Sequence, residues 1–273
     1  MLVSPDINAQ LTKSDRRILE FIETNKEEFL IMTIVDLAHK LDLSEATISR
    51  FARKIGTKDF KDLRNQVFDN NTNPGAAGKM RKTLDKNKDA DLDNYLQKQI
   101  DNINKTLSHL DKEQFDQACI EISKRKKIYV FAKHAGKALA NLLKVRLGRI
   151  GIEVVTLASG GTEMIEGLAQ INPEDLILVF SFTKISKEAA IILEQKAEAK
   201  YKVILFTSRI YQAEEEDGDL NIYVYRGEKN EYHSQTAPTA ILDAMIVKIT
   251  KLTKDHSLEN LEKIKKLKSK YQD

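Results

Sequence analysis

The sequence predicts an α/β protein of two domains, an N-terminal all-α helix-turn-helix bundle followed by a five-stranded parallel doubly wound domain of the flavodoxin-like type. Three observations support this prediction. Up to residue 68 the apolar residues recur at helical spacing, whereas beyond residue 125 short β-rich apolar runs alternate with helical patterns. A length of 273 residues is also long for one domain and suits two that each bury a core.

The composition is that of a folded protein without a cofactor or metal motif. Apolar residues make up 41% and charged residues 31%, and a net charge of +3 excludes a uniformly basic nucleic-acid coat. The single cysteine, Cys119, excludes an intrachain disulfide, and no run of residues has metal-ligand spacing. No segment has a signal-peptide pattern or the roughly 18 apolar residues of a membrane span, so we expect a cytoplasmic protein with no membrane partner.

Two short helices joined by a tight turn are predicted over 34–41 and 45–55. Thr33 and Ser44 supply capping hydroxyls, apolar residues follow each of them at helical spacing, and Gly56 stands where a helix usually ends. Amphipathic patterns before and after this pair predict two more helices, which together with it would close a small core.

The second of these helices has the features of a DNA-recognition helix. Residues 14–45 hold four Lys or Arg against eight Asp or Glu, whereas residues 46–66 hold six against two, so the positive charge is local. Short polar side chains near the N-terminus of the helix suit base edges in a major groove, and its basic residues suit phosphates or guanine. The alternative is an ordinary helical hairpin whose charges form a solvated face. The candidate DNA-binding residues are Ser44, Glu45, Thr47, Ser49, Arg50, Arg53, Lys54 and Lys58.

Residues 69–91 contain few large apolar residues and carry turn signals, so we expect them to link a domain over 1–68 to one over 92–273. The second domain begins with a helical apolar stripe spaced nearly like a coiled-coil seam. Such a stripe needs a partner, either the rest of the second domain or the same helix of a twin chain in a dimer. The stripe consists of Leu92, Leu96, Ile100, Ile103, Leu107 and Leu110.

Short strands alternating with helices predict a parallel sheet that is covered on both faces and wound by right-handed crossovers. The expected strands are Lys127–Ala132, Glu153–Leu157, Asp175–Phe180, Lys202–Phe206 and Leu220–Tyr225, and the expected helices cover about 136–149, 162–170, 186–199, 235–253 and 257–270. In such sheets ligands bind outside the carboxyl ends of the strands, which here are the loops at 132–136, 158–162 and 181–186.

The loop at 181–186 has the composition of an anion site. Ser181, Thr183 and Ser186 offer hydroxyls, Lys184 offers a cation, and the following helix offers its first amides, so a phosphorylated small metabolite is the expected ligand. His134, in the loop after the first strand, could donate to the same ligand. The alternative is that Ser and Thr serve only as caps and turn formers at this junction.

Several motifs give the chain a resemblance to a known family over nearly its whole length. In the N-terminal part these are Leu11-Thr-Lys-Ser14, Ile34-Val-Asp-Leu-Ala38, Leu43-Ser-Glu-Ala-Thr-Ile-Ser-Arg-Phe51, Lys54-Ile-Gly56 and Asp59-Phe-Lys-Asp-Leu63. In the second half they are Ile128-Tyr-Val-Phe131, Leu147-Gly-Arg-Ile-Gly151 and Pro173-Glu-Asp175. The chain resembles the RpiR/MurR family of bacterial transcriptional regulators, which implies a helix-turn-helix domain and a C-terminal sugar isomerase (SIS) domain that senses a phosphosugar and dimerises.

The ligand loops depart from the family pattern. Where the family usually has Gly-x-Gly-x-Ser, this chain has Ala132-Lys-His-Ala-Gly136, so one phosphate-binding hydroxyl is replaced by Gly136. The usual Ser-x-Ser-Gly-x-Thr appears as Ser181-Phe-Thr-Lys-Ile-Ser186, in which Lys184 takes the place of a glycine and fills space that glycine leaves to a ligand. The resemblance assigns ligand binding to His134, Gly136, Ser181, Thr183, Lys184 and Ser186.

The leading hypothesis is a DNA-binding transcriptional regulator of carbohydrate or related metabolism, without enzymatic activity. We expect a homodimer, or a dimer of dimers, that binds a double-stranded operator with inverted half-sites and responds to a sugar phosphate or another small anion. Two alternatives remain, a sugar-phosphate isomerase with an accessory helical domain and a ligand-independent DNA-binding protein whose SIS domain is only a scaffold.

Overall fold

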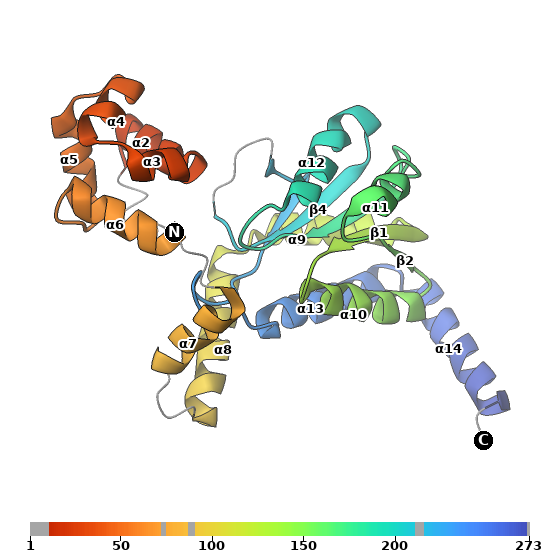
Figure 1. The fold of residues 1–273 in the computed structure, drawn as a ribbon. Coiled ribbons are helices and arrows are strands. Elements are labelled where there is room, and N and C mark those ends of the chain that lie inside the picture. Colours follow the sequence, from red (N-terminus) through yellow and green to blue (C-terminus); the bar gives the residue numbers. More distant parts are fainter. Residues whose placement is uncertain (1–10, 72–74, 87–90, 211–215, 272–273) are drawn as a thin grey trace. The chain divides into compact units, whose positions relative to one another are not determined.

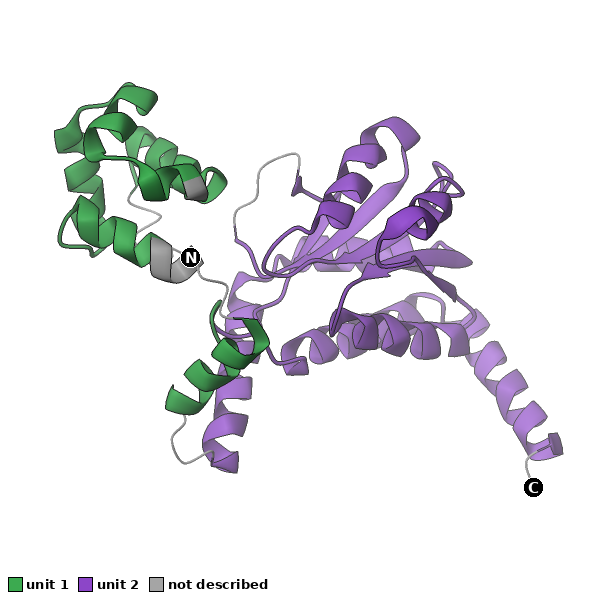
Figure 2. Cartoon of the chain, viewed as in Figure 1, with its two compact units in different colours: residues 1–86, 229–232 green, residues 87–228, 233–273 purple. Residues whose placement is uncertain are grey.

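The computed structural model describes residues 11–71, 75–86, 91–210 and 216–271 (Figure 1). The chain divides into two compact units (Figure 2). The first consists of residues 1–86 with 229–232, and the second of residues 87–228 with 233–273. Among the described residues, no helix is both long and apolar enough to cross a membrane.

The first unit is helical, as predicted. Its helices are α2 (Lys13–Thr24), α3 (Lys26–Ile31), α4 (Ile34–Leu41), α5 (Glu45–Lys54), α6 (Phe60–Asn71) and α7 (Gly75–Lys86). Fully buried side chains from α2 to α6, among them Ile22, Phe29 and Phe51, form one core. The rings of Phe29 and Phe60 meet edge to face with centroids 5.6 Å apart, which joins α3 to α6.

Helix α7 occupies most of the segment that the sequence predicts as a linker. An amphipathic helix ordinarily buries its apolar side chains, but in α7 Met80 and Leu84 are exposed and Thr83 is buried. The Thr83 hydroxyl accepts a hydrogen bond of 2.8 Å from the amide of Tyr232, within the same unit. The predicted domain limits of 1–68, 69–91 and 92–273 stay a prediction.

The second unit is built on the predicted five-stranded parallel sheet, whose strand order is β2-β1-β3-β4-β5. The strands are β1 (Lys127–Ala132), β2 (Glu153–Thr156), β3 (Leu176–Phe180), β4 (Lys202–Thr207) and β5 (Leu220–Tyr223). The helices are α8 (Leu92–His109), α9 (Lys112–Ser123), α10 (Gly136–Arg149), α11 (Gly161–Leu168), α12 (Lys187–Ala199), α13 (Thr236–Leu252) and α14 (Lys254–Tyr271).

Alternate residues of the central strands face two separate cores, as the two-sided apolar pattern predicts. One core joins Ile128, Leu178 and Phe206 to helices α9, α10 and α13. The other joins Phe131 and Val179, on the opposite face, to α11 and α12. Figure 1 shows α11 and α12 on one side of the sheet and α10 and α13 on the other. Because the chain leaves β1 first toward β2 and later returns to β3, the winding reverses direction between β1 and β3.

Most of the predicted apolar stripe is exposed and does not pack on the rest of the second unit, so the first of the two expectations for it holds only for Leu110, which packs against the core. Leu92, Leu96, Ile100 and Leu107 are half exposed or more, and Gln99, Asn102 and Thr106 are buried instead. The reason is local. Thr106 lies beside the end of β5, where its hydroxyl accepts a hydrogen bond of 3.0 Å from the amide of Tyr225.

Candidate functional site

The predicted helix pair forms with the predicted limits to within one residue. Thr33 caps α4 in a capping box with Asp36, whose side chain accepts hydrogen bonds from the amide and hydroxyl of Thr33. Helix α4 ends at Asp42, which adopts the left-handed conformation with φ at 50° and turns the chain toward α5. Ser44 then caps α5 by accepting a hydrogen bond of 3.2 Å from the amide of Thr47.

A chain of polar contacts runs along the exposed side of α5. The hydroxyls of Ser44 and Thr47 lie 2.9 Å apart, and Nη2 of Arg50 donates to the Thr47 hydroxyl at 3.3 Å. The Nε of Arg50 donates to the carbonyl of Ala46, also at 3.3 Å. These contacts hold the guanidinium of Arg50 along its own helix, next to the short side chains at the N-terminus.

The remaining predicted DNA-binding residues share one region of the first unit. Glu45, Arg53 and Lys58 are exposed, while Thr47 and Ser49 are half buried. The buried side of α5 consists of Ile48, Phe51 and Ala52. The helix thus buries its apolar face in the core and exposes to solvent the face on which Arg50 and Arg53 lie.

Lys54 has a structural partner that the sequence pattern did not indicate. Its Nζ lies 2.7 Å from Oδ2 of Asp15, a side chain only 9% exposed on α2. Burial acts to raise the pKa of Asp15, but the hydrogen bonds from Lys54 and Thr12 outweigh it and hold that pKa below its ordinary value. Lys54 therefore ties α5 to α2, and its charge is neutralised within the protein.

In the second unit, two of the predicted ligand-binding hydroxyls serve the local structure. The buried Ser181 donates through its hydroxyl to the carbonyl of Lys184 at 2.9 Å, which closes the loop after β3. Ser186 caps α12 by accepting a hydrogen bond of 3.2 Å from the amide of Ala189. The capping and turn roles weighed from the sequence are thus present at both positions.

The other predicted ligand-binding residues differ in accessibility. Lys184 and His134 are exposed, and Thr183 is half buried. His134 adopts the left-handed conformation with φ at 49°, which costs a non-glycine residue energy and is concentrated at functional turns. Gly136 is buried at the start of α10, where a Cβ would lie 3.5 Å from the Cβ of Ala132, an ordinary contact distance.

An ion pair that the sequence analysis missed connects the strand-end loops. Lys133, after β1, lies 2.8 Å from Oε2 of Glu188 in the first turn of α12. A Cβ built on Gly160, in the loop after β2, would lie 3.1 Å from Oε1 of the same carboxylate. The three loops therefore meet around Glu188. The hydrogen bond from Lys133 is the main cause that holds the pKa of Glu188 at about 2.

The signal that could have found this pair was available in the sequence. All three loops follow neighbouring parallel strands, and their charged residues, Lys133 and Glu188, had to lie close to one another. The predicted site contained only hydroxyls and cations, because these are the groups that bind a phosphate.

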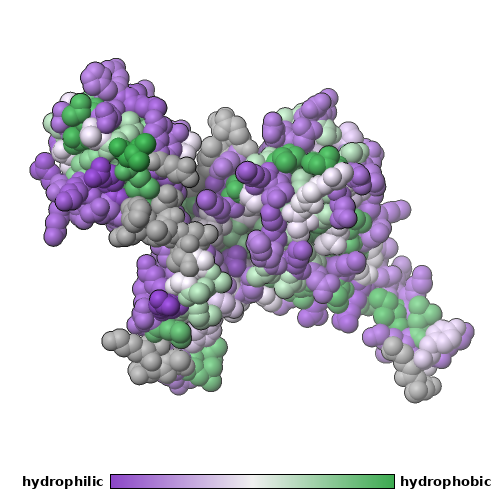
Figure 3. All heavy atoms as spheres, viewed as in Figure 1, coloured by the Kyte–Doolittle hydropathy of each residue, from purple (hydrophilic) through white to green (hydrophobic). Residues whose placement is uncertain are grey.

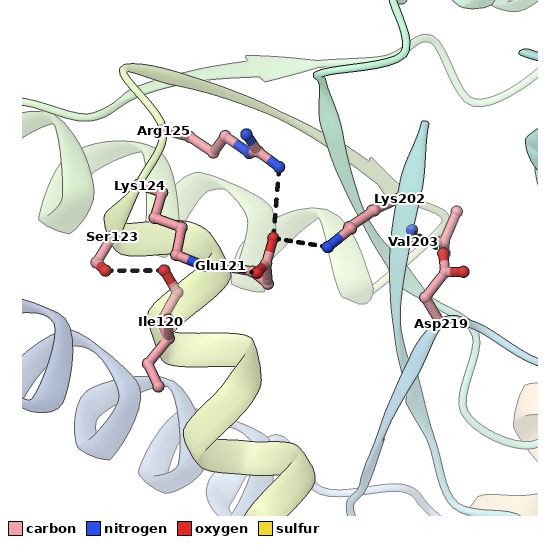
Figure 4. Close-up of polar contacts among 8 residues, drawn as sticks. All are labelled: Ile120, Glu121, Ser123, Lys124, Arg125, Lys202, Val203 and Asp219. Carbon is pink, nitrogen blue, oxygen red and sulfur yellow. Dashed lines mark hydrogen bonds and ion pairs between the residues drawn. The ribbon is translucent and has the colours of Figure 1, made fainter. Parts of the chain in front are cut away.

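A hollow of about 460 Å³ lies at the opposite edge of the sheet, away from these loops, and is lined by Arg125, Gly151, Thr253 and His256 among others. Beside it the nearly buried Glu121 of α9 accepts contacts from Lys124 at 3.0 Å and Lys202 at 3.1 Å (Figure 4). These bonds tie α9 to β4. We regard the strand-end loops as the better candidate site, because the first amides of α12 lie there, whereas Lys124 and Arg125 at the other edge are engaged with Glu121.

No group of three or more His, Cys, Asp or Glu side chains is arranged to hold a metal ion in the described part of the chain. The polar groups that the strand-end loops present include Lys133, Lys184, Thr183, Glu188 and the first amides of α12.

Comparison with known families matches both halves of the chain. The model of the helix-turn-helix domain of the rpiR family matches residues 6–74, and the model of the SIS domain matches residues 121–248. Among curated proteins, the chain is similar to the HTH-type transcriptional regulator HexR of Escherichia coli. The two are 24% identical over 204 residues, which cover 72% of this chain and 68% of HexR.

Two solved structures share the fold. The Vibrio vulnificus NanR protein complexed with ManNAc-6P aligns over 94% of this chain and 93% of its own, with a TM-score of 0.59 and 16% identity. A crystal structure described as a putative sugar-phosphate isomerase from Listeria monocytogenes aligns over 62% of this chain and 91% of its own, with a TM-score of 0.53 and 17% identity.

Proposed function

Because the chain belongs to the rpiR family of helix-turn-helix proteins and carries a SIS domain, we propose that this DNA-binding transcriptional regulator reads its operator through α5 and responds to a small anion at the strand-end loops. The observation that carries the first part is the solvent-facing side of α5, where Arg50 is held beside the Ser44 and Thr47 hydroxyls. Such a face fits a major groove.

The residues proposed to contact DNA are those of the predicted set that remain accessible. Lys54 is left out, since its ammonium pairs with Asp15. The proposed contacts are Ser44, Glu45, Thr47, Ser49, Arg50, Arg53 and Lys58. Two copies related by a two-fold axis would place two such helices on one face of the duplex, which gives an operator of inverted half-sites.

For the second unit we propose a ligand that carries both a phosphate or similar anion and hydroxyl groups. The anion would meet Lys184, the hydroxyl of Thr183 and the first amides of α12, where the helix dipole favours negative charge. Glu188 would accept hydrogen bonds from the hydroxyls, with Lys133 balancing its charge. A sugar phosphate has both groups, and the NanR structure with ManNAc-6P contains such a ligand.

Selection from a random duplex library with the full chain tests the DNA-binding part. We expect enrichment of an inverted repeat whose half-sites are centred about 10 base pairs or a multiple of that apart. Enrichment of a single unrepeated site would contradict dimeric reading, and no enrichment above non-specific binding would contradict operator recognition itself.

Thermal-shift measurements with a panel of sugar phosphates test the ligand part, since a ligand that binds only the folded state raises the melting temperature by mass action. Lys184→Ala should reduce the shift, whereas Lys251→Ala, which changes an exposed lysine in the last turn of α13, serves as the matched control. The absence of a shift with every sugar phosphate and with inorganic phosphate would favour a ligand-independent scaffold.

The rival function, sugar-phosphate isomerisation, is supported by the structural likeness to the Listeria protein. Isomerisation needs a general base whose pKa lies near the working pH. Glu188, one of the carboxylates at the loops, is paired with Lys133, which holds its pKa at about 2 and makes it a weak base. We therefore propose a regulator without turnover. We further propose that, as a DNA-binding protein, it acts in the cytoplasm. Conversion of aldose phosphates to ketose phosphates by the purified chain would reverse this choice.

A further inference from the structure

Helix α8 exposes its apolar side and buries its polar side, the reverse of an ordinary amphipathic helix. We call the side chains of Leu92, Leu96, Ile100, Ile103 and Leu107 the α8 stripe. Their exposed fractions run from 36% at Ile103 to 66% at Leu92. Figure 3 shows apolar side chains at the surface in the region of α8. Soluble monomeric proteins seldom expose an apolar row of this length, and such a row usually marks an interaction surface.

Polar contacts fix the rotation of α8, so the stripe has no freedom to turn inward. The hydroxyl of Thr106 accepts from the amide of Tyr225 at 3.0 Å and donates to the carbonyl of Asn102 at 2.8 Å. The side-chain Nδ2 of Asn102 in turn donates to Oε1 of Gln99 at 3.3 Å. Turning the stripe inward would break the part-buried hydrogen bond between Thr106 and Tyr225, and such a bond contributes about 0.5–1.5 kcal/mol.

The area of the stripe matches what a specific interface needs. Five aliphatic side chains that are about half exposed leave on the order of 500 Å² of apolar surface in water, which is near the largest patch that monomeric proteins carry. If two copies of the stripe covered each other, the total would reach roughly 1,000 Å², the lower limit for a specific interface between proteins.

We propose that the stripe is covered by the α8 stripe of a second copy of this chain, with the two helices antiparallel and the two-fold axis beside Ile100. This assignment rests on the proposed function insofar as that function requires a dimer. The spacing fits, since Leu92 and Leu107, and likewise Leu96 and Ile103, lie nearly symmetrically about Ile100. An isologous pair needs this symmetry, because each residue must face its mirror position on the partner.

Charge decides between antiparallel and parallel pairing. Asp93 is exposed and lies three and seven residues before Leu96 and Ile100, so it shares their side of the helix. Parallel pairing would set Asp93 against the Asp93 of the second copy, at the edge of an apolar seam. Antiparallel pairing separates the two Asp93 carboxylates and sets each near the C-terminal turn of the second α8, which carries the basic residue His109.

Single cysteines with a short bismaleimide cross-linker test this arrangement in the full chain. The native Cys119 is buried, and burial raises the pKa of its thiol to about 12, so it gives no background. Ile100→Cys should cross-link to itself at least about tenfold faster than Ile165→Cys, because pairing raises the local concentration of the thiols. Ile165 is the matched control, with an exposed fraction of 48% against 50% for Ile100.

The orientation is read from the two ends of the stripe, which lie about 22 Å apart along the helix. A mixture of Leu92→Cys and Leu107→Cys chains should cross-link, and neither alone should. Cross-linking of each variant with itself overturns the antiparallel pairing. An Ile100→Cys rate no faster than that of Ile165→Cys overturns the interface and assigns the stripe to another occupant.

Sedimentation of Ile100→Glu provides the second measurement. It should shift the chain from dimer to monomer at micromolar concentration while the circular dichroism spectrum stays native, since Ile100 is half exposed within one chain. The melting temperature should fall only by the mass-action stabilisation that the dimer provides. The proposed function fails independently of this interface. Cross-linked dimers that bind no DNA would reject the function and keep the interface, whereas operator binding with no cross-link would do the reverse.

Discussion

The ion pair between Lys54 and Asp15 allows a direct separation of folding from DNA reading within α5. Replacement of Lys54 by Met keeps the aliphatic part of the side chain and removes the ammonium. Asp15, with a side chain 9% exposed, then keeps its hydrogen bonds with Thr12 but loses its counter-ion. Arg50→Met is the matched variant, because Arg50 lies four residues earlier on the same helix and is exposed.

The expected cost follows from the burial of the two partners. Exposed ion pairs contribute about 0.2–1 kcal/mol, and breaking a fully buried pair costs about 3–5 kcal/mol. Lys54 is 32% exposed and Asp15 is 9% exposed, so we expect Lys54→Met to cost about 1–2 kcal/mol, between these limits. For a unit of this size that lowers the melting temperature by roughly 4–16 °C. Arg50→Met should change stability by less than about 0.5 kcal/mol.

The pH dependence gives a second, independent signature. The pKa of Asp15 is below its ordinary value of 3.8 in the folded protein, so the pair stabilises the fold above that value. As the pH falls through the folded-state pKa, Asp15 becomes protonated and the contribution is lost. The difference in melting temperature between the native chain and Lys54→Met should therefore shrink in acid.

Operator binding should show the opposite order of effects. Anisotropy of labelled operator DNA should report a loss of about 1–3 kcal/mol per half-site for Arg50→Met, roughly 5- to 150-fold. Lys54→Met, measured below its lowered melting temperature, should bind within a few-fold of the native chain. If Lys54→Met melted at the native temperature and lost as much affinity as Arg50→Met, the structural role of Lys54 would be wrong.

Three further outcomes are expected. Lys200→Gly should stabilise the second unit by about 0.5–1 kcal/mol in chemical denaturation, since Lys200 ends α12 with φ at 62°, a conformation that glycine adopts without strain; a loss of stability would contradict this. The Glu188–Lys133 pair stabilises the fold at pH values above the ordinary glutamate pKa, and this contribution is lost as the pH falls toward about 2. Glu188→Gln should remove this part of the acid dependence and cost less than about 1 kcal/mol at neutral pH. Thermal melts between pH 2 and 7 would show both effects. Cys119, with its thiol pKa raised to about 12, should resist maleimide at pH 8 in the native chain and react once in urea, and rapid native labelling would show that α9 opens.

The fold followed from local patterns that tertiary structure did not override. The capping residues Thr33 and Ser44 mark the starts of α4 and α5, and strands such as β3, apolar at every position, could only belong to a sheet covered on both faces. Helix α8 was the exception. Its apolar period was read correctly, but its orientation depends on the amide of Tyr225, more than a hundred residues away, which no local pattern records.

The candidate sites were predictable in position more than in detail. The strand-end loops follow from sheet topology alone, and Arg50 and Arg53 lie on the face expected of them. What the pattern lacks is the identity of long-range partners. Lys54 was predicted to contact DNA because nothing in the sequence around it indicates that it pairs with Asp15, 39 residues earlier. The local sequence likewise does not indicate that the hydroxyls of Ser181 and Ser186 bond to the backbone of their own loop and helix.

The two edges of the sheet have a consequence for how this protein behaves when it is crowded. Strand β2 is four residues long and carries the exposed Glu153. Strand β5 is equally short, and beside it Gln114 accepts a hydrogen bond of 2.7 Å from the amide of Asn221. The short length of both strands, the charge on β2 and the side-chain bond at β5 leave a foreign strand few positions at which to pair. Concentrated solutions should therefore resist the growth of cross-β aggregates, which leaves helix surfaces as the route by which copies associate.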